Sequence, residues 1–433
     1  MTVLQRRWRL VLAATLLHAV VAGFAVSPLF FMPSVATARR VFGGSNGERA
    51  LFEDVRAYHD YASRTLNGVI PYRDFDVEYP IGALPLFLVP RLIASEEIAY
   101  RWAFAAEMLL FDAALVWLVA KRGERTIGAG RAVFWYSLGL GCLGGLPIAR
   151  FDLAAAFLTF AAMMAWESNR AGIAGFLAGI GGLVKLFPIV VVAPWMVQNR
   201  DRRMRLSVIL MSTVFIGAGL WWIIGGAGVA KSLHYHSGRG LEIESLYAGI
   251  LIVVAKMLGW PLAHHFNHSS VELIAPYAGI AAKISPLFQL AAMGWILFRS
   301  LRAESTRSSQ VARVVPDQCS SGSLDQHGSS TIRASQTRTL SGQQEAACVL
   351  AFALFSKVLS PQYLLWLLPF AATLEGRAGA RSRPLLVAAC GLTTLLYFWA
   401  GVGLVQFHPL AIAILNGRNV LLLGIFLVLF KQT

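Results

Sequence analysis

Charged residues are scarce in this sequence, and acidic residues are the scarcer kind. Only 14% of the 433 residues are charged, and 23 carboxylates stand against 38 basic side chains. Soluble domains carry about 25% charged residues. Cysteine is rare as well: there are four, with no C-x-x-C spacing, so neither a disulfide framework nor a metal knuckle is indicated. These shortages exclude an ordinary soluble enzyme and a disulfide-stapled scaffold.

Long hydrophobic runs fill the chain instead. Hydrophobic residues make up 56% of the sequence, and many runs are long enough to cross a hydrocarbon core of about 30 Å. The sequence therefore predicts an all-α polytopic membrane protein, organised as a single membrane domain over residues 1–433. The first run, residues 10–32, lacks the cleavage pattern of a signal peptide and is expected to be retained.

The net charge of +15 is concentrated in short basic loops between the hydrophobic runs. Such loops mark the cytoplasmic side by the positive-inside rule and do not indicate a nucleic-acid partner. Together with the N-terminal MTVLQRRWR, they predict that both termini are cytoplasmic. The loops are KRGERTIGAGR at 121–131, QNRDRRMR at 198–205 and RAGARSR at 377–383.

This topology predicts about twelve transmembrane helices. Because the basic loops are all expected in the cytoplasm, the number of spans between two of them must be even. Segments 80–94 and 246–262 would make that number odd if they crossed, so they are expected to lie on the outer surface or dip into it. The pair within 171–198 could instead form a re-entrant hairpin. Residues 301–344 are expected to form a disordered cytoplasmic loop. The predicted spans are 10–32, 98–120, 131–149, 151–166, a pair within 171–198, 206–225, 276–298, 345–358, 361–375, 384–402 and 409–430.

The first outer loop, residues 33–97, gathers carboxylates among aromatic side chains. Ser45 and Glu48 form an S-x-x-E capping box and Asn67-Gly68 supplies a stop, which predicts a short helix lying on the membrane. Asp54, Tyr58 and Tyr61 would share one face of that helix, a surface suited to a sugar. Alternatively, Asp54 lies near the start of the helix and stabilises it by interacting with the helix dipole, and the tyrosines anchor the helix at the membrane interface. The loop also holds Asp60, Asp74, Asp76, Glu78 and Tyr79.

Basic and imidazole groups are expected on the same outer side. Lys185 in GLVKLFP and Lys357 in FSKVLSP each precede a proline that interrupts a span, where a cation faces opened helix backbone. Ionisable groups at membrane depth are functional candidates, although either lysine alone could snorkel to the headgroups. With the second outer loop, 226–275, they suggest a phosphate site. The candidate residues are Arg150, Lys185, His234, His236, Arg239 and Lys357.

A base facing cations suits transfer of a sugar from a lipid phosphate to a hydroxyl. The phosphate leaves as an anion, so cations replace a general acid and one carboxylate suffices, with inversion at the anomeric carbon. Glu107 and Asp112 lie within a predicted span and are expected to be polar links between helices, or else a proton relay. Asp152 could pair with Arg150 or carry substrate hydroxyls.

Six strings in this order resemble one family: DVRAY at 54–58, PYRDFDVEYP at 71–80, RFDL at 150–153, GLVKLFP at 182–188, HYHSGRGLEIES at 234–245 and SPQYLLWLLP at 360–369. The chain resembles the multi-span glycosyltransferases of the C fold (GT-C), within them the polyprenyl-phosphate-mannose-dependent alpha-(1,2)-mannosyltransferase-like group, glycosyltransferase family 87. Two positions depart from its pattern: Ile81 where a second proline is common, and Glu242 where glutamine is expected.

The resemblance implies that Asp54 is the catalytic base, that the outer loops form the donor and acceptor cavity, and that no metal or other cofactor is needed. It further implies a polyprenyl-phosphate-linked sugar donor, a glycolipid or cell-envelope glycan acceptor, and a multi-pass location in the bacterial inner membrane. Glu244, Gln362 and Tyr363 join the substrate-binding candidates through the matched strings. A transporter or flippase of lipid-linked sugars is the main alternative function, and a scaffold subunit is another.

Overall fold

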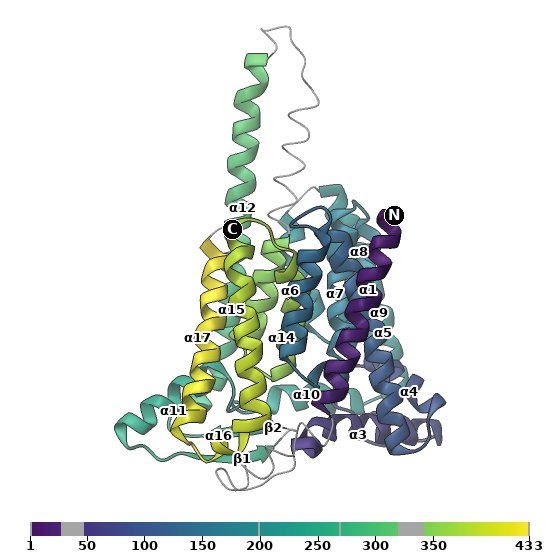
Figure 1. The fold of residues 1–433 in the computed structure, drawn as a ribbon, viewed down its shortest axis with the longest axis vertical. Coiled ribbons are helices and arrows are strands. Elements are labelled where there is room, and N and C mark those ends of the chain that lie inside the picture. The colour runs from purple at the N-terminus through teal and green to yellow at the C-terminus, as the bar shows by residue number, and fades with distance from the viewer. Residues whose placement is uncertain (1, 27–46, 198–199, 268–269, 319–341, 432–433) are drawn as a thin grey trace.

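A computed structural model describes residues 2–26, 47–197, 200–267, 270–318 and 342–431 of the chain. The architecture is an all-α bundle with one small hairpin (Figure 1). Both termini lie at one end of the bundle, and α3, α11 and the hairpin lie at the opposite end. This arrangement agrees with the predicted placement of both termini on one side and the acidic loop on the other.

Five helices of the described part are long and apolar enough to cross a membrane. The protein is therefore an all-α polytopic membrane protein, consistent with the GT-C class, while the count of about twelve spans stays a prediction. The five are α1 (Val3–Ala25), α5 (Glu97–Gly123), α9 (Arg200–Gly225), α12 (Ala278–Gln318) and α17 (Pro409–Lys431).

Shorter elements complete the bundle and its loops. They are α3 (Gly47–Leu66), η1 (Ile81–Ala83), α4 (Leu84–Ile93), α6 (Ala129–Cys142), η2 (Leu146–Ile148), α7 (Asp152–Glu167), α8 (Ala171–Val184), η3 (Phe187–Val197), α10 (Gly228–Gly238), α11 (Leu246–Leu258), a helix over 342–354, η4 (Pro361–Tyr363), α14 (Leu364–Thr373), α15 (Gly376–Thr394), the π-helical η5 (Leu395–Ala400) and α16 (Gly401–Val405).

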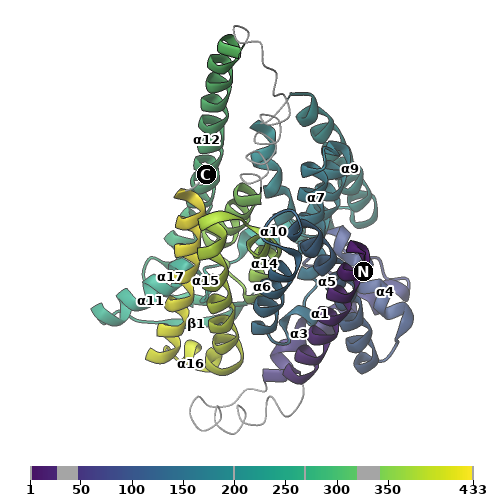
Figure 2. The ribbon, with the colours of Figure 1, turned by 45° about the horizontal axis from the view of Figure 1, so that its top comes forward.

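Two features depart from the expected outline. Strands β1 (Ala263–Asn267) and β2 (Ser270–Ile274) pair in antiparallel fashion within the second loop, which the all-α expectation did not include. Helix α12 continues to Gln318 and extends past the bundle at the end that bears the termini (Figure 2). The first part of the loop expected over 301–344 is thus helical, and residues 319–341 lie outside the described part.

Helix α3 forms as the sequence predicts and ends where expected. Gly68 adopts φ +84°, its N–H donates to Thr65 O at 3.1 Å, and Val69 N donates to Arg64 O at 3.0 Å. This is the Schellman arrangement that satisfies the last carbonyls of a helix. Ser45 and the side chain of Glu48, the expected capping box, lie outside the described residues.

Close helix contacts bring α8 against α9. An added Cβ at Gly175 would lie 2.5 Å from Leu206 O, and one at Gly179 would lie 2.8 Å from Thr213 Cβ. The two glycines form a G-x-x-x-G pair, which lets membrane helices approach backbone to backbone. This packing fixes the position of the C-terminal end of α8, and therefore the position of Lys185, which follows the last residue of the helix.

A buried polar cluster ties three helices together. His18 Nδ1 of α1 lies 2.6 Å from Asp112 Oδ2 of α5, and Tyr136 OH of α6 donates to Asp112 Oδ1 at 2.9 Å. Asp112 and His18 are almost fully buried. The contacts fit the expectation that Asp112 links helices, because they satisfy both of its carboxylate oxygens inside the bundle.

Candidate active site

A cavity of about 260 Å³ is lined in part by residues of α3. It draws on the acidic loop, the RFD segment at 150–152, the loop after α10 and the residues around η4, so the fold brings these four segments to one cavity. Its lining residues are Asp54, Tyr58, Glu78, Tyr79, Pro80, Phe151, Asp152, Lys185, Leu186, Phe187, Tyr235, Arg239, Phe352, Ser356, Lys357, Val358, Ser360, Gln362, Tyr363 and Trp366.

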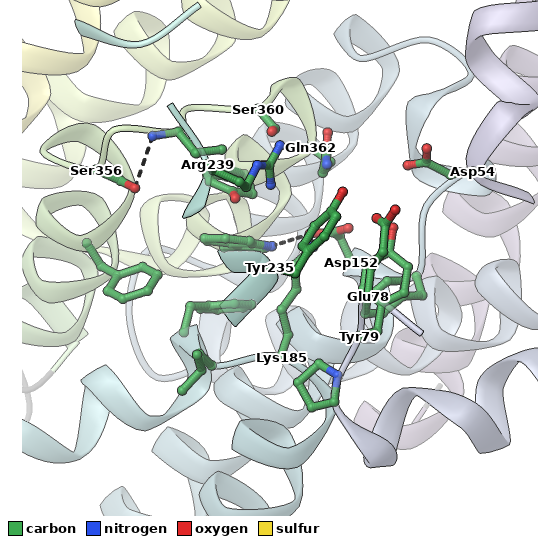
Figure 3. Close-up of a pocket in the computed structure, with 18 of the residues that line it drawn as sticks. Asp54, Glu78, Tyr79, Asp152, Lys185, Tyr235, Arg239, Ser356, Ser360 and Gln362 are labelled. Atoms are coloured by element: carbon green, nitrogen blue, oxygen red, sulfur yellow. Dashed lines mark hydrogen bonds and ion pairs between the residues drawn. The ribbon is translucent and has the colours of Figure 1, made fainter. Parts of the chain in front are cut away.

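The carboxylates and the cationic loops stand on different sides of this cavity. Figure 3 shows Asp54 and Glu78 on one side and Arg239, Ser356 and Ser360 on the other, with Lys185 below. Ten of the sixteen residues proposed from sequence line the cavity. The cavity therefore presents a carboxylate and a cation on different sides.

Asp54 sits on α3 beside the buried face of that helix. Val55, Tyr58 and Ala62 are buried at helical spacing, which orients the neighbouring Asp54 toward the cavity. Tyr58 stacks on Phe87 with ring centroids 4.3 Å apart. The aromatic packing fixes the helix, so the carboxylate is presented from a rigid element.

Arg150 holds Asp54 by an ion pair from Nε to Oδ2 at 2.8 Å. Its other nitrogens donate to Ala149 O at 2.8 Å and to Tyr397 OH at 3.0 Å. Burial lowers the pKa of Arg150, but Asp54 and the neighbouring tyrosines together raise it by more, so the net shift is upward and the guanidinium stays charged. Arg150 does not line the cavity itself; it orients the carboxylate that does.

Asp152 pairs with Lys185 and not with Arg150, so the expected pair between Asp152 and Arg150 does not form. Lys185 Nζ lies 2.8 Å from Asp152 Oδ1, and Trp366 Nε1 donates to the same oxygen at 2.6 Å. Asp152 is the first residue of α7 and Lys185 follows the last residue of α8. Two helix ends thus meet at the cavity.

The cationic side of the cavity is built from two loops that hold each other. Lys357 Nζ donates to Arg239 O at 2.6 Å, and Glu242 N donates to Lys357 O at 3.0 Å. Partial burial, followed by the neighbouring Arg239, lowers the pKa of Lys357. For Arg239, burial lowers the pKa while Glu242 raises it, and the net shift is upward.

Glu242, one of the two departures from the family pattern, links these two loops by hydrogen bonds. Its carboxylate accepts from Leu359 N at 2.6 Å and from Ser360 Oγ at 3.1 Å, and it is buried. Burial raises its pKa, against the opposing effect of Arg239. The side chain therefore acts on the shape of the cationic side of the cavity.

Glu244 lies away from the cavity, against Arg418 of α17. Arg418 Nη1 lies 3.5 Å from Glu244 Oε2, and Nη2 donates to Glu244 O. Arg418 is fully buried within an apolar helix. A lone arginine in a predicted span was the available signal for this anchor, and the sequence reasoning did not use it.

Five further candidates do not line the cavity or have side chains outside the described residues. Asp74 accepts from Ile70 N at 2.9 Å and closes a turn with Arg73, and Asp76 is exposed, 3.9 Å from Lys231. His234 is exposed and does not line the cavity. The side chain of His236 lies outside the described residues. Tyr61 packs against Phe75 instead of lining the cavity with Tyr58.

Several lining residues were not singled out from the sequence. Tyr235, Ser356, Ser360 and Trp366 belong to the quoted strings HYHSGRGLEIES, FSKVLSP and SPQYLLWLLP, so their signal was present, whereas Phe352 lies in an apolar run and gave none. Across the described ranges, no group of three or more His, Cys, Asp or Glu side chains is placed to hold a metal ion.

Comparison with known proteins gives one match. The family model described as Glycosyltransferase family 87 matches residues 78–315, just over half of the chain. No curated protein and no solved structure matches the chain. Asp54 and the segment 352–366 lie outside the matched stretch, and the fold brings both to the same cavity as residues within it.

Proposed function

Since the chain belongs to glycosyltransferase family 87, we propose that it moves a hexose, with mannose as the first candidate, from a polyprenyl-phosphate donor to a hydroxyl of a lipid or cell-envelope glycan. The reaction takes place at the outer face of the bacterial inner membrane. The observation that carries this proposal is that Asp54, Arg239 and Lys357 line one cavity, with Asp54 and Arg239 on opposite sides of it (Figure 3).

In this reaction Asp54 is the general base. It takes the proton of the acceptor hydroxyl while that oxygen attacks the anomeric carbon, and the bond from that carbon to the phosphate oxygen breaks. The new glycosidic bond forms on the face opposite the phosphate, so the configuration inverts. Arg150 supports this role because it fixes the carboxylate without occupying the cavity.

The leaving phosphate is received by Arg239 and Lys357. Positioned cations stabilise the charge that develops on a leaving group in an enclosed site. The carboxylate of Asp152 already balances the charge of Lys185, so Lys185 is the least suited of the three cations to hold the phosphate. Ser356 lines the same cavity and offers a hydroxyl donor.

A lipid-linked donor is supported by the apolar part of the lining. Leu186, Phe187, Phe352 and Val358 lie in the same cavity as the cations, and Leu186 is 58% exposed. A prenyl chain leaving the phosphate would meet these side chains. The location at the outer face is supported by the basic N-terminus, which lies at the end opposite α3 and marks the cytoplasm by the positive-inside rule.

The test is transfer of radiolabelled mannose from polyprenyl-phosphate-mannose into membrane glycolipid, at matched protein levels. Asp54→Asn should lower transfer by roughly 10²- to 10⁴-fold, the usual contribution of a general base. Asp60→Asn is the matched control, because Asp60 lies on the same helix with a side chain that is 52% exposed and does not line the cavity.

Equal transfer by Asp54→Asn and the intact chain would remove Asp54 as the base. If neither the intact chain nor any variant transfers mannose, donors carrying other hexoses are tested next. Movement of the lipid-linked sugar across the membrane without transfer of the sugar would favour the flippase alternative.

A further inference from the structure

Asp152 uses only one of its two carboxylate oxygens within the protein. Oδ1 receives both Lys185 Nζ and Trp366 Nε1. Oδ2 is buried and has no hydrogen-bond partner among the described residues. A buried charged oxygen without a partner is costly, and such an atom calls for an explanation.

The position of Asp152 points to that explanation. It lines the cavity, and in the close-up it lies between Asp54 and Glu78 on one side and Arg239 and Ser360 on the other (Figure 3). The sugar ring must occupy this interval, because its anomeric carbon lies between the base and the phosphate during transfer. Ring hydroxyls are the hydrogen-bond donors that would come nearest to Asp152.

Lys185 and Trp366 hold this carboxylate in one orientation. Lys185 Nζ lies 4.7 Å from the ring centre of Phe151, 5.4 Å from that of Trp366 and 5.7 Å from that of Tyr363. A cation placed over several aromatic faces and paired with a carboxylate is well satisfied. Both donors to Oδ1 come from packed elements, so they leave Oδ2 as the oxygen available to a ligand.

On the premise of the proposed function, we propose that Asp152 Oδ2 accepts a hydrogen bond from one ring hydroxyl of the transferred hexose. Asp152 is then a specificity-determining residue for the donor sugar. Lys185 and Trp366 are positioning residues that act through it.

The test uses a series of prenyl-phosphate donors, each lacking one ring hydroxyl, with the full chain in membranes. For the intact chain, one deoxy donor should lose roughly 10- to 100-fold in kcat/KM, as expected for a hydrogen bond to a charged group. Asp152→Asn should show a similar loss with the natural donor and no further loss with that same deoxy donor. Trp366→Phe should weaken the discrimination without abolishing it.

Two further variants separate recognition from folding. Asp152→Ala combined with Lys185→Met removes both buried charges together, so no unpaired ion is left if Asp152→Asn alone fails to fold. This double variant should also fail to distinguish the same deoxy donor. Asp60→Asn should keep the full discrimination of the intact chain.

If the loss caused by Asp152→Asn multiplied the loss caused by the missing hydroxyl for every deoxy donor, the inference would be overturned. Asp152 would then act on folding or geometry alone. Discrimination that survives in the double variant would overturn it too. If the intact chain transfers no sugar from any polyprenyl-phosphate donor, the proposed function itself fails. The two failures are therefore distinguishable.

Discussion

Replacement of Arg239 by glutamine should lower kcat/KM for the lipid-linked donor and leave the KM for the acceptor nearly unchanged. Arg239 lines the cavity opposite Asp54, and its Nε has no hydrogen-bond partner among the described residues. A hydrogen bond to a charged group contributes about 1.5 to 3 kcal/mol. At about 1.36 kcal/mol per factor of ten, kcat/KM for the donor should fall roughly 10- to 150-fold.

The assay is the initial rate of transfer at varied donor and fixed acceptor, then the reverse. The KM for the acceptor should stay near that of the intact chain, and Arg239→Lys should recover part of the loss. Lys231→Gln is the matched control, because Lys231 precedes Arg239 in the same segment and its side chain is 74% exposed. A change of less than about twofold in donor kcat/KM, or a loss confined to the acceptor, would refute the role of Arg239.

Three further predictions concern pH and stability. Partial burial and Arg239 lower the pKa of Lys357, and the protonated form that binds phosphate is lost as pH rises through that pKa. The donor KM should therefore rise between neutral pH and the ordinary lysine pKa of about 10.4, and Lys357→Arg should remove the rise; a flat profile for the intact chain would contradict this. Arg418→Met should cost about 3 to 5 kcal/mol of stability because it leaves the buried Oε2 of Glu244 without its ion partner. Burial raises the pKa of Glu244 to about 7, so Glu244 is ionised above that pH, and thermal melting should show a larger loss at alkaline than at acidic pH, recovered by adding Glu244→Gln. Gly175→Ala should lower the melting temperature by overpacking α8 against α9, at about 1 to 3 kcal/mol, while Gly172→Ala, whose added Cβ meets only Ile209 Cγ1 at 3.8 Å, should not.

Local sequence signals predicted the local structure well. Helix α3 and its stop at Asn67-Gly68 follow from helix-forming residues and a glycine with φ +84°. The family followed from short strings in a fixed order, and a match over residues 78–315 bears it out. These features depend on neighbours in the chain, so the sequence alone carries them.

Ion partners were harder to predict, because they depend on which helix ends meet. Arg150 and Asp152 are two residues apart, which made a pair between them plausible. In the fold each points to another segment, Arg150 to Asp54 and Asp152 to Lys185. Short helices gave a similar difficulty: α7 has 16 residues and α8 has 14, so hydropathy alone does not say how far each crosses the bilayer.

The hydrogen bond from Trp366 to Asp152 joins residues 214 positions apart, and it has a consequence for biosynthesis. Membrane chains are inserted as they emerge from the ribosome, and domains form in order from the N-terminus. The carboxylate of Asp54 is made early, but the cavity lacks a wall until the segment 352–366 has entered the bilayer. A nascent chain that stops before that segment has Asp54 without the complete cavity, so under the proposed function the capacity to bind a donor arises only near the end of synthesis.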